Sequence, residues 1–280
     1  MTGDDAGGSA ARYLSAWRLR PDGTPRDDDG ALELPVRTRS GEPAVLRISR
    51  SGNDHEHLAL RLWGGCGAVR LLRAEPADRA LLLERTEDRD LRELPELESC
   101  RVLGELVRAL ARPPRPPFAR LSEAAGRWQE ELEADAGLDS RFPRRFRLQA
   151  AKNLSRLRRD ELDAALVHRE LHHGAVHAAR RAPWLATGAV PVLGTPEFAL
   201  VPALGHPAAE AAHGGTRAAA LADRIEALAL AAQADPERLR AWALVRWTVA
   251  ARRASRGPGD RPAPETGRLV QLCKAVQRGA

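Results

Sequence analysis

The side chains most able to do chemistry lie in the segment from Leu166 to Leu204. It begins with four histidines around one glutamate, namely His168, Glu170, His172, His173 and His177. Imidazole and carboxylate groups act as general bases and as ligands of transition metals. A loop rich in glycine and proline completes the segment, which is typical of loops that carry function. A metal site and a base-catalysed reaction are therefore the two interpretations to compare.

The spacing of the histidines argues against a zinc site. His168 and His172 are four residues apart and would share one face of a helix, but Arg169 stands where the zinc-protease motif requires its glutamate. The zinc deaminase signature also begins with H-x-E, but it needs a later P-C-x-x-C, which the sequence lacks. We therefore expect structural roles for the histidines, with His168 bracing the backbone of its loop.

The composition predicts a helix-rich globular protein. Of the 280 residues, 43% are hydrophobic and only 4% aromatic, so Leu, Val and Ala must form most of the core. Three scattered cysteines without a C-x-x-C pair suggest neither a disulfide framework nor a thiolate metal site. The first residues do not resemble a secretion signal, and no run is long enough to span a membrane. We expect a soluble, cytoplasmic protein without a membrane partner.

The positive charge does not by itself indicate a nucleic-acid partner. Lysine and arginine total 44 against 38 acidic residues, a net charge of +6. Nucleic-acid binding needs cations gathered on one face, whereas acidic residues interleave with the basic ones almost everywhere in this sequence. We therefore expect no nucleic-acid partner.

Two sets of elements must position the segment. Strand-length apolar runs at 31–38 and 43–49 are joined by a Ser-Gly turn and predict a hairpin. A helix follows, which Asp54 would cap and which contains Glu56 in its first turn. From Leu91 onward apolar residues recur at helical spacing. The helical patterns cover 97–110, 121–132, 146–157, 217–232, 236–254 and 269–276. Asp235 and Pro236 would begin one of these helices.

The aromatic residues of the second half are expected to pack in the core. These are Trp184, Phe198, Trp242 and Trp247.

Several separated motifs resemble the aminoglycoside phosphotransferases, and in particular the streptomycin 6-phosphotransferase and hydroxyurea phosphotransferase group. The catalytic and metal loops match at LVH (166–168), LHHG (171–174), APWLA (182–186) and G-x-P-x-F (194–198). Strand-like segments at 32–36 and 44–49, a hinge at 81–85 and a late helix at 235–244 match as well. The likeness covers most of the chain.

The resemblance implies an α+β fold of the protein-kinase-like, bilobal type. A small β-rich N-lobe would comprise residues 1–88, with hairpins and one helix, and a larger helical C-lobe would comprise residues 89–280. The C-lobe would carry the catalytic-loop equivalent at 166–176 and the metal-loop equivalent at 184–200. A cleft between two lobes is a common small-molecule site, and residues 208–216 would contribute to its specificity.

The chain departs from the family at the positions that do the chemistry. The resemblance puts the base aspartate at Glu170 and the metal-binding asparagine at Ala175. The Asp-Pro-Lys metal motif begins at Gly188, which has no side chain for a cation that prefers oxygen ligands. The strand lysine becomes Arg47, which is planar and does not replace lysine at a fitted site. Both protein ligands of magnesium are thus missing.

We therefore predict a pseudokinase of this family. The resemblance implies ATP as cofactor, with weakened or absent magnesium dependence, and an aminoglycoside or hydroxyurea-like ligand. Two alternatives stay open: an active ATP-dependent O-phosphotransferase with Glu170 as base, and a non-catalytic regulatory or interaction protein. We favour for Glu170 the simpler role of a solvated or salt-bridged acid, with Arg169 or Arg47 as its partner. Arg47 and Glu56 could bind nucleotide phosphates or form an ordinary ion pair between strand and helix.

Overall fold

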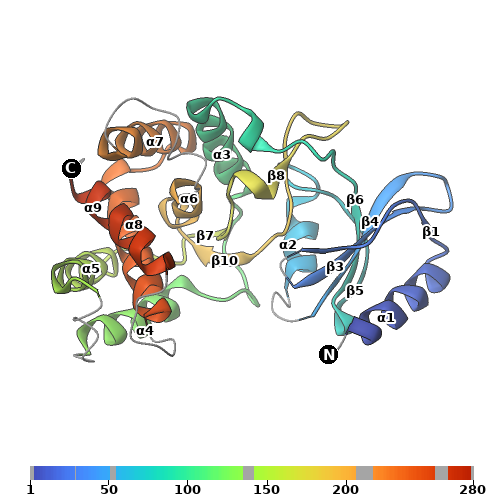
Figure 1. Ribbon diagram of the computed structural model, residues 1–280, viewed down its shortest axis with the longest axis horizontal. Coiled ribbons are helices and arrows are strands. Elements are labelled where there is room, and N and C mark those ends of the chain that lie inside the picture. The colour runs from blue at the N-terminus through green and yellow to red at the C-terminus, as the bar shows by residue number, and fades with distance from the viewer. Residues whose placement is uncertain are drawn as a thin grey trace. The chain divides into compact units, whose positions relative to one another are not determined.

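The computed structural model shows two compact units, whose elements are labelled in Figure 1. The N-terminal unit consists of Met1–Asp90 and Val176–Pro191, and the C-terminal unit of Leu91–Ala175 and Val192–Ala280. The structure describes residues 3–28, 30–50, 55–134, 142–205, 217–255 and 264–278. The predicted cap Asp54 and the predicted specificity segment 208–216 lie outside these ranges.

An antiparallel sheet forms the N-terminal unit. Its strand order is β1-β3-β4-β6-β5, and β2 pairs with β3 at the edge. The predicted hairpin at 31–49 is confirmed as β3 and β4, with Leu34 opposite Leu46. The strands are β1 (Arg20–Pro21), β2 (Arg26–Asp28), β3 (Ala31–Arg37), β4 (Pro43–Ser49), β5 (Leu71–Glu75) and β6 (Ala80–Glu84), and a 3-10 turn, η1 (Pro76–Asp78), joins the last two.

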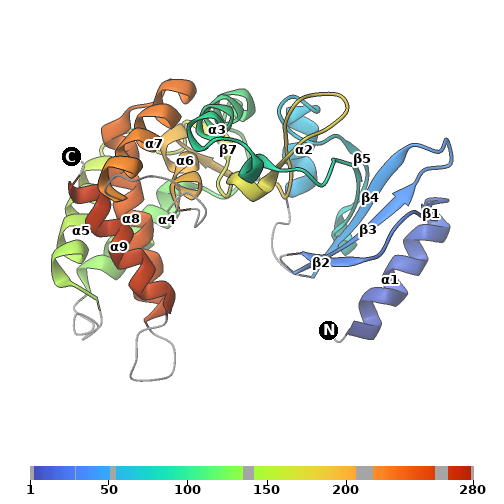
Figure 2. The same cartoon turned by 45° about the horizontal axis from the view of Figure 1, so that its top comes forward.

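The two faces of this sheet bury different side chains. Because side chains alternate along a strand, Leu46 and Ile48 face the helix α1 (Gly3–Ala16), where Tyr13 joins their apolar cluster. Figure 2 shows α1 beside the sheet. Arg47 lies between these two residues and therefore points to the opposite face. The alternation thus separates Arg47 from the cluster under α1.

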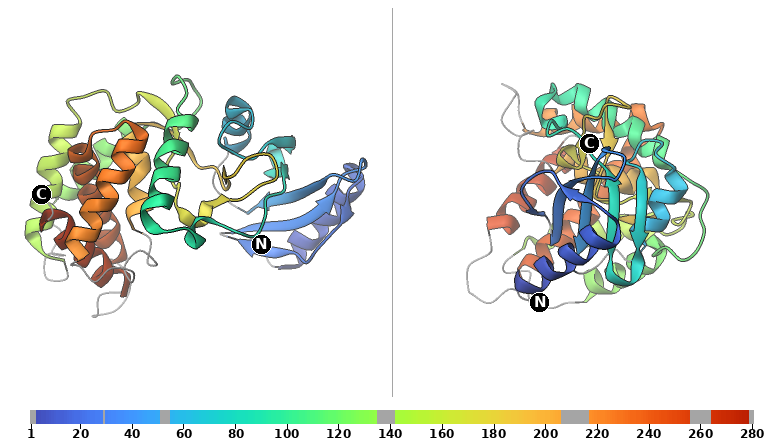
Figure 3. Two further views of the ribbon diagram at one scale, coloured as in Figure 1. Left: turned by 90° about the horizontal axis from the view of Figure 1, so that it is seen from above. Right: turned by 90° about the vertical axis from the view of Figure 1, so that its right-hand side faces the viewer.

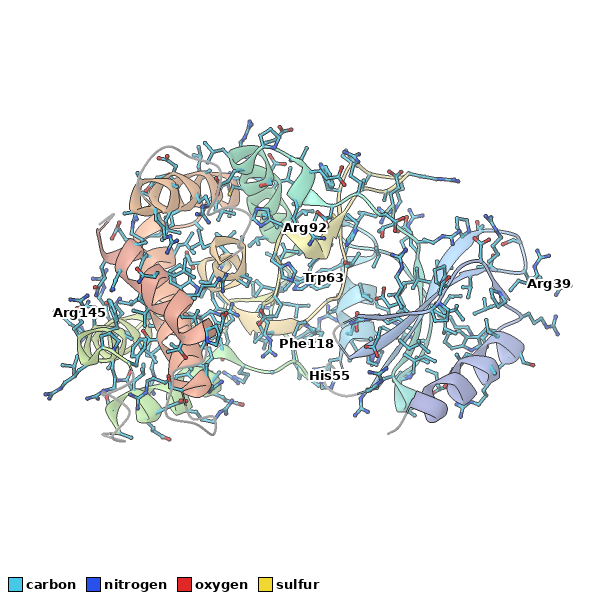
Figure 4. All side chains as sticks on the ribbon, in the orientation of Figure 1. Arg39, His55, Trp63, Arg92, Phe118 and Arg145 are labelled. Carbon is cyan, nitrogen blue, oxygen red and sulfur yellow. The ribbon has the colours of Figure 1, made fainter. Side chains whose placement is uncertain are left out.

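The helix α2 (Glu56–Trp63) follows and ends at Gly64, whose φ of 58° is left-handed. Glycine adopts this conformation without the steric cost of a Cβ atom. The last residue of α2, Trp63, labelled in Figure 4, is buried and anchors the helix in the unit.

Residues 176–191 pack with the N-terminal unit, although the sequence interpretation assigned 184–200 to the C-lobe. This segment contains β8 (Val176–His177) and β9 (Leu185–Ala186), which pair with each other. The amide of Ala186 donates to the carbonyl of Gly67 at 2.9 Å. Arg181 binds the carboxylate of Glu84 through Nε at 2.9 Å and the carbonyl of Gly65 through Nη1 at 2.7 Å. These long-range bonds account for the difference.

Helices form most of the C-terminal unit, as the apolar spacing predicts. Asp235 caps α8, where its side chain accepts hydrogen bonds from the amides of Glu237 and Arg238, and Pro236 is the first residue of the helix. The helices are α3 (Glu96–Leu110), α4 (Leu121–Glu133), α5 (Arg144–Leu157), α6 (Pro196–Leu204), α7 (Arg217–Ala232), α8 (Pro236–Ala254) and α9 (Pro264–Arg278). Shorter elements are β7 (Ala165–His168) and β10 (Pro191–Gly194), which pair, and the 3-10 turns η2 (Leu91–Glu93) and η4 (His173–Ala175).

The helix α8 lies in the centre of this unit. It packs against α5, α6, α7 and α9, and α7 to α9 are the orange and red helices of Figure 3. Trp242 is fully buried and meets Phe198 edge-on, with ring centroids 5.3 Å apart.

Trp247 is buried as predicted, whereas Trp184, which belongs to the N-terminal unit, is only partly buried and lies under the guanidinium of Arg89. Within the described ranges, no helix is long and apolar enough to cross a membrane.

Candidate functional site

The loop after β7 holds the predicted base position. The strand ends at His168, which is 2% exposed. Its Nδ1 accepts a hydrogen bond from the amide of Glu170 at 3.2 Å. The imidazole therefore fixes the backbone of the loop two residues downstream, which is the bracing geometry expected from the sequence.

Glu170 forms an ion pair within the C-terminal unit. Its Oε1 lies 3.0 Å from Nη2 of Arg246 on α8 and 3.8 Å from Nε of Arg169. The side chain of Glu170 is 43% exposed, so solvent reaches the carboxylate despite the pair. Arg169, one of the two partners expected for Glu170, is thus nearby, but the closer partner is Arg246, which no local sequence pattern connects with Glu170.

Arg246 connects three segments of the C-terminal unit. Besides Glu170, it binds the carbonyl oxygens of Arg169 at 3.0 Å and Phe198 at 3.2 Å, both through Nη1. Its guanidinium also lies over the ring of Phe198, 4.6 Å from the centroid. Burial lowers the pKa of this guanidinium, and the charge of Glu170 opposes that effect. The signal that could have revealed it is its spacing, because Arg246 follows the buried Trp242 by one helical turn in an apolar run.

The remaining histidines have separate partners. Nε2 of His173 lies 3.0 Å from Oγ of Ser99, and both residues are buried. Nδ1 of His172 accepts from the amide of Gly174 at 3.2 Å. His177 belongs to β8 in the N-terminal unit. Across the residues that the structure describes, no group of three or more histidine, cysteine, aspartate or glutamate residues could hold a metal ion.

Arg47 and Glu56 come together in the N-terminal unit. Nη1 of Arg47 lies 2.5 Å from Oε1 of Glu56, and its Nε lies 3.4 Å from Oε1 of Glu33, the residue opposite it on β3. One guanidinium thus faces two carboxylates. Burial raises the pKa of Glu56, whereas Arg47 and the amide of Ala189, which donates to the carboxylate, oppose that rise. The same carboxylate therefore joins β4, α2 and the segment after β9.

The two predicted metal positions carry no ligand atoms on their side chains. Ala175 ends η4, and its amide donates to the carbonyl of His172 at 2.9 Å. Gly188 has a φ of 56°, and a Cβ added there would meet nothing within 4 Å. Magnesium prefers several oxygen ligands in octahedral geometry. The residues at these two positions therefore do not fit a magnesium site.

Comparison with known proteins establishes the relationship. The family model "Aminoglycoside/hydroxyurea antibiotic resistance kinase" matches residues 16–257. The chain belongs to this family. Its match includes all the positions just described, Arg47, Glu56, Glu170, Ala175 and Gly188.

Individual members of the aminoglycoside/hydroxyurea antibiotic resistance kinase family are similar over long stretches. The chain is 36% identical over 200 residues to streptomycin 6-kinase of Streptomyces griseus, and the alignment covers 69% of this chain and 65% of that protein. It is 34% identical over 258 residues to hydroxyurea phosphotransferase of Kitasatospora aureofaciens, with coverage of 85% and 70%. The chain thus spans slightly less than two thirds of the streptomycin 6-kinase.

Solved structures confirm the expected fold class for this member of the family. An amicoumacin kinase superposes with a TM-score of 0.63 at 13% identity, covering 99% of this chain and 96% of that one. A choline kinase from Streptococcus pneumoniae superposes with a TM-score of 0.61 at 11% identity, covering 99% and 100%. The fold is α+β and kinase-like, with a β-rich N-lobe and a helical C-lobe.

Proposed function

We propose that this chain is a pseudokinase of the aminoglycoside/hydroxyurea antibiotic resistance kinase family. The observation that carries the proposal is the absence of oxygen-bearing side chains at Ala175 and Gly188. Phosphoryl transfer relies on positioning and on metal ions that neutralise the developing charge. A chain without these ligands binds magnesium poorly and transfers a phosphoryl group slowly.

The contacts of Glu170 support the proposal. A general base needs a carboxylate oxygen within hydrogen-bond reach of the acceptor hydroxyl. Oε1 of Glu170 is engaged by Arg246, and Arg169 adds a second positive charge nearby. The carboxylate oxygen that would have to accept the hydroxyl proton is therefore already paired with an arginine of the same unit.

The contacts of Arg47 support the proposal as well. Glu33 and Glu56 both face the guanidinium of Arg47. When both carboxylates are ionised, the three side chains together carry a net charge of −1. This cluster therefore offers little positive potential to a phosphate. ATP, if it binds, would bind with weak or no dependence on magnesium.

The expected loss of rate is large. Each preorganised electrostatic element typically contributes about 10²–10³-fold, so two missing metal ligands lower the rate by roughly 10⁴–10⁶-fold if their effects multiply. An altered base typically removes a further ~10²–10⁴-fold.

Calorimetry of ADP and ATP binding with and without magnesium tests the missing ligands. We expect the affinity of the wild-type protein to be the same in both conditions. The variant Ala175→Asn/Gly188→Asp should gain magnesium dependence, since aspartate tolerates the left-handed conformation and the space at Gly188 is open. Gly126→Asp on α4, where an added Cβ is equally free, is the matched control. Magnesium-dependent phosphorylation of streptomycin or hydroxyurea by the wild-type protein would disprove the proposal.

A second candidate is an active antibiotic O-phosphotransferase with Glu170 as base. The 43% exposure of the Glu170 side chain favours it, because a substrate hydroxyl could approach the carboxylate. ATP turnover would then rise when an aminoglycoside or hydroxyurea is added, and Glu170→Gln would abolish the rise. Glu237→Gln, which alters another exposed, arginine-paired glutamate, should leave the turnover unchanged.

A further inference from the structure

The helix α5 carries an unusual concentration of positive charge. Residues 142–159 contain no aspartate or glutamate. Six cations on or directly after this helix are exposed: Arg144, Arg145, Lys152, Arg156, Arg158 and Arg159. The expectation that the chain has no nucleic-acid partner relied on acidic residues interleaving with basic ones. That premise does not hold on α5.

Three of the cations form one stripe along the helix. Arg145, Lys152 and Arg156 are separated by seven and four residues, which places them within about 40° of one another around an α-helix and spreads them over about 16 Å. The buried residues Phe146 and Leu154 lie on the other side, where α5 packs against α4 and α8. Figure 4 labels Arg145 on the outer side of α5.

The exposed cations of α5 are not neutralised by ion pairs. In the described part of the chain none of the six forms one, although Arg145 contacts the ring of Phe146. The acids that follow the helix are engaged elsewhere: Asp160 pairs with Arg238, and Glu161 accepts the amide of Asp163. An arginine-rich composition accounts for the large number of arginines in the chain. It does not account for the six exposed cations of α5 having no acidic partners among the residues that the structure describes.

A polar cavity adjoins the stripe. It has a volume of about 730 Å³ and is lined by Gln149, Asn153 and Arg156 of α5 and by Arg240 of α8. Arg240 is 10% exposed, and its Nη1 has no hydrogen-bond partner among the described residues. The carboxylates of the cavity are already occupied, because Asp160 and Glu237 pair with arginines and Asp235 caps α8. Arg240 itself is compensated by Glu226 and Glu237, so the cavity adds to the stripe a single free donor within the described ranges, Nη1 of Arg240, and the positive charge that carries the inference is that of α5.

We propose that the stripe Arg145, Lys152 and Arg156 binds the phosphate backbone of duplex DNA. Guanidinium groups match phosphate geometry, and DNA presents one negative charge about every 1.7 Å of its axis. A membrane surface fits less well, since interfacial helices need a wide apolar face and the only large hydrophobic residue of α5 recorded as exposed is Leu148. Binding would be independent of base sequence, because backbone contacts do not read bases.

Fluorescence anisotropy with a labelled 20-base-pair duplex tests the proposal. Each phosphate contact contributes about −0.9 to the slope of log K against log salt concentration. Three contacts predict a slope near −2.7, hence roughly a 40-fold loss of affinity between 50 and 200 mM salt. The variant Arg145→Gln/Lys152→Gln/Arg156→Gln should bind far more weakly and lose most of this slope.

The matched control removes the same charge elsewhere. Arg39, Arg101 and Arg115 are exposed and form no ion pair within the described ranges, so Arg39→Gln/Arg101→Gln/Arg115→Gln should retain the wild-type affinity and slope. Equal weakening in both triple variants would overturn the proposal, as would unchanged binding in the α5 variant. Tighter binding of anionic lipid vesicles or of poly-glutamate than of the duplex would overturn it as well. Circular dichroism melting shows that the variants are folded.

Discussion

Replacing Arg246 with leucine should destabilise the C-terminal unit by about 3 kcal/mol. The substitution removes two charged hydrogen bonds to backbone carbonyls and one to Glu170. Removing one partner of a buried charged pair costs roughly 3–5 kcal/mol. We take the lower limit because the side chain of Glu170 is 43% exposed and can be solvated when its partner is lost.

Urea denaturation followed by far-UV circular dichroism measures this change, since most helices belong to the C-terminal unit. At 2–4 °C per kcal/mol for a unit of this size, the melting temperature should fall by about 6–12 °C. Arg253→Leu on the same helix is the matched control. Arg253 is 54% exposed and pairs with Glu131 at 3.3 Å, so its loss should change the free energy of unfolding by less than about 1 kcal/mol.

The double variant Arg246→Leu/Glu170→Gln separates the ion pair from the backbone contacts. If the ion pair between Arg246 and Glu170 stabilises the protein, the double variant should lose less unfolding free energy than the sum of the losses in the two single variants. A loss below about 1 kcal/mol for Arg246→Leu alone, comparable with a surface pair, would refute the inference that Arg246 holds the Glu170 loop.

Two further predictions concern stability. Gly104→Val on α3 should destabilise the protein by about 1–3 kcal/mol, because a Cβ atom there would lie 2.7 Å from the carbonyl oxygen of Leu228 on α7. Gly126→Ala on α4, where an added Cβ atom meets nothing within 4 Å, should be neutral or stabilising in the same urea titration. The pKa of Asp163 lies below its ordinary value because hydrogen bonds from Ser122 and Arg120 outweigh the effect of burial. The ionised Asp163 therefore stabilises the protein above the ordinary aspartate pKa, and this stabilisation is lost as the pH falls through the lowered pKa. The substitution Asp163→Asn should flatten the dependence of the unfolding free energy on pH between about 5 and 2. An unchanged dependence would contradict the assignment of this effect to Asp163.

Local patterns in the sequence predicted the elements. Apolar spacing located α4, α5, α7 and α8 because each buries one face, and Asp235 with Pro236 marked the beginning of α8. Strand alternation predicted the β3–β4 hairpin and hence the side of the sheet on which Arg47 lies. Motif likeness then gave the family and the fold class.

Contacts between distant segments could not be predicted in this way. Arg246 and Glu170 are 76 residues apart, and nothing in the local pattern pairs them. The packing of 176–191 with the N-terminal unit depends on Arg181, whose donors satisfy Glu84 and two carbonyl groups. Trp184 was expected in the core but lies partly exposed beneath Arg89, because apolarity alone does not reveal a cation that covers the ring.

The hydrogen bond from the amide of Ala189 to Glu56 has a consequence for how the protein responds to its surroundings. A loop held by a bound ion is ordered only to the extent that the ion occupies its site, which depends on the free concentration of the ion. Here a backbone amide, which is present in every copy of the chain, supplies the anchoring donor. Chelators and changes in magnesium concentration should therefore leave this segment in the same conformation.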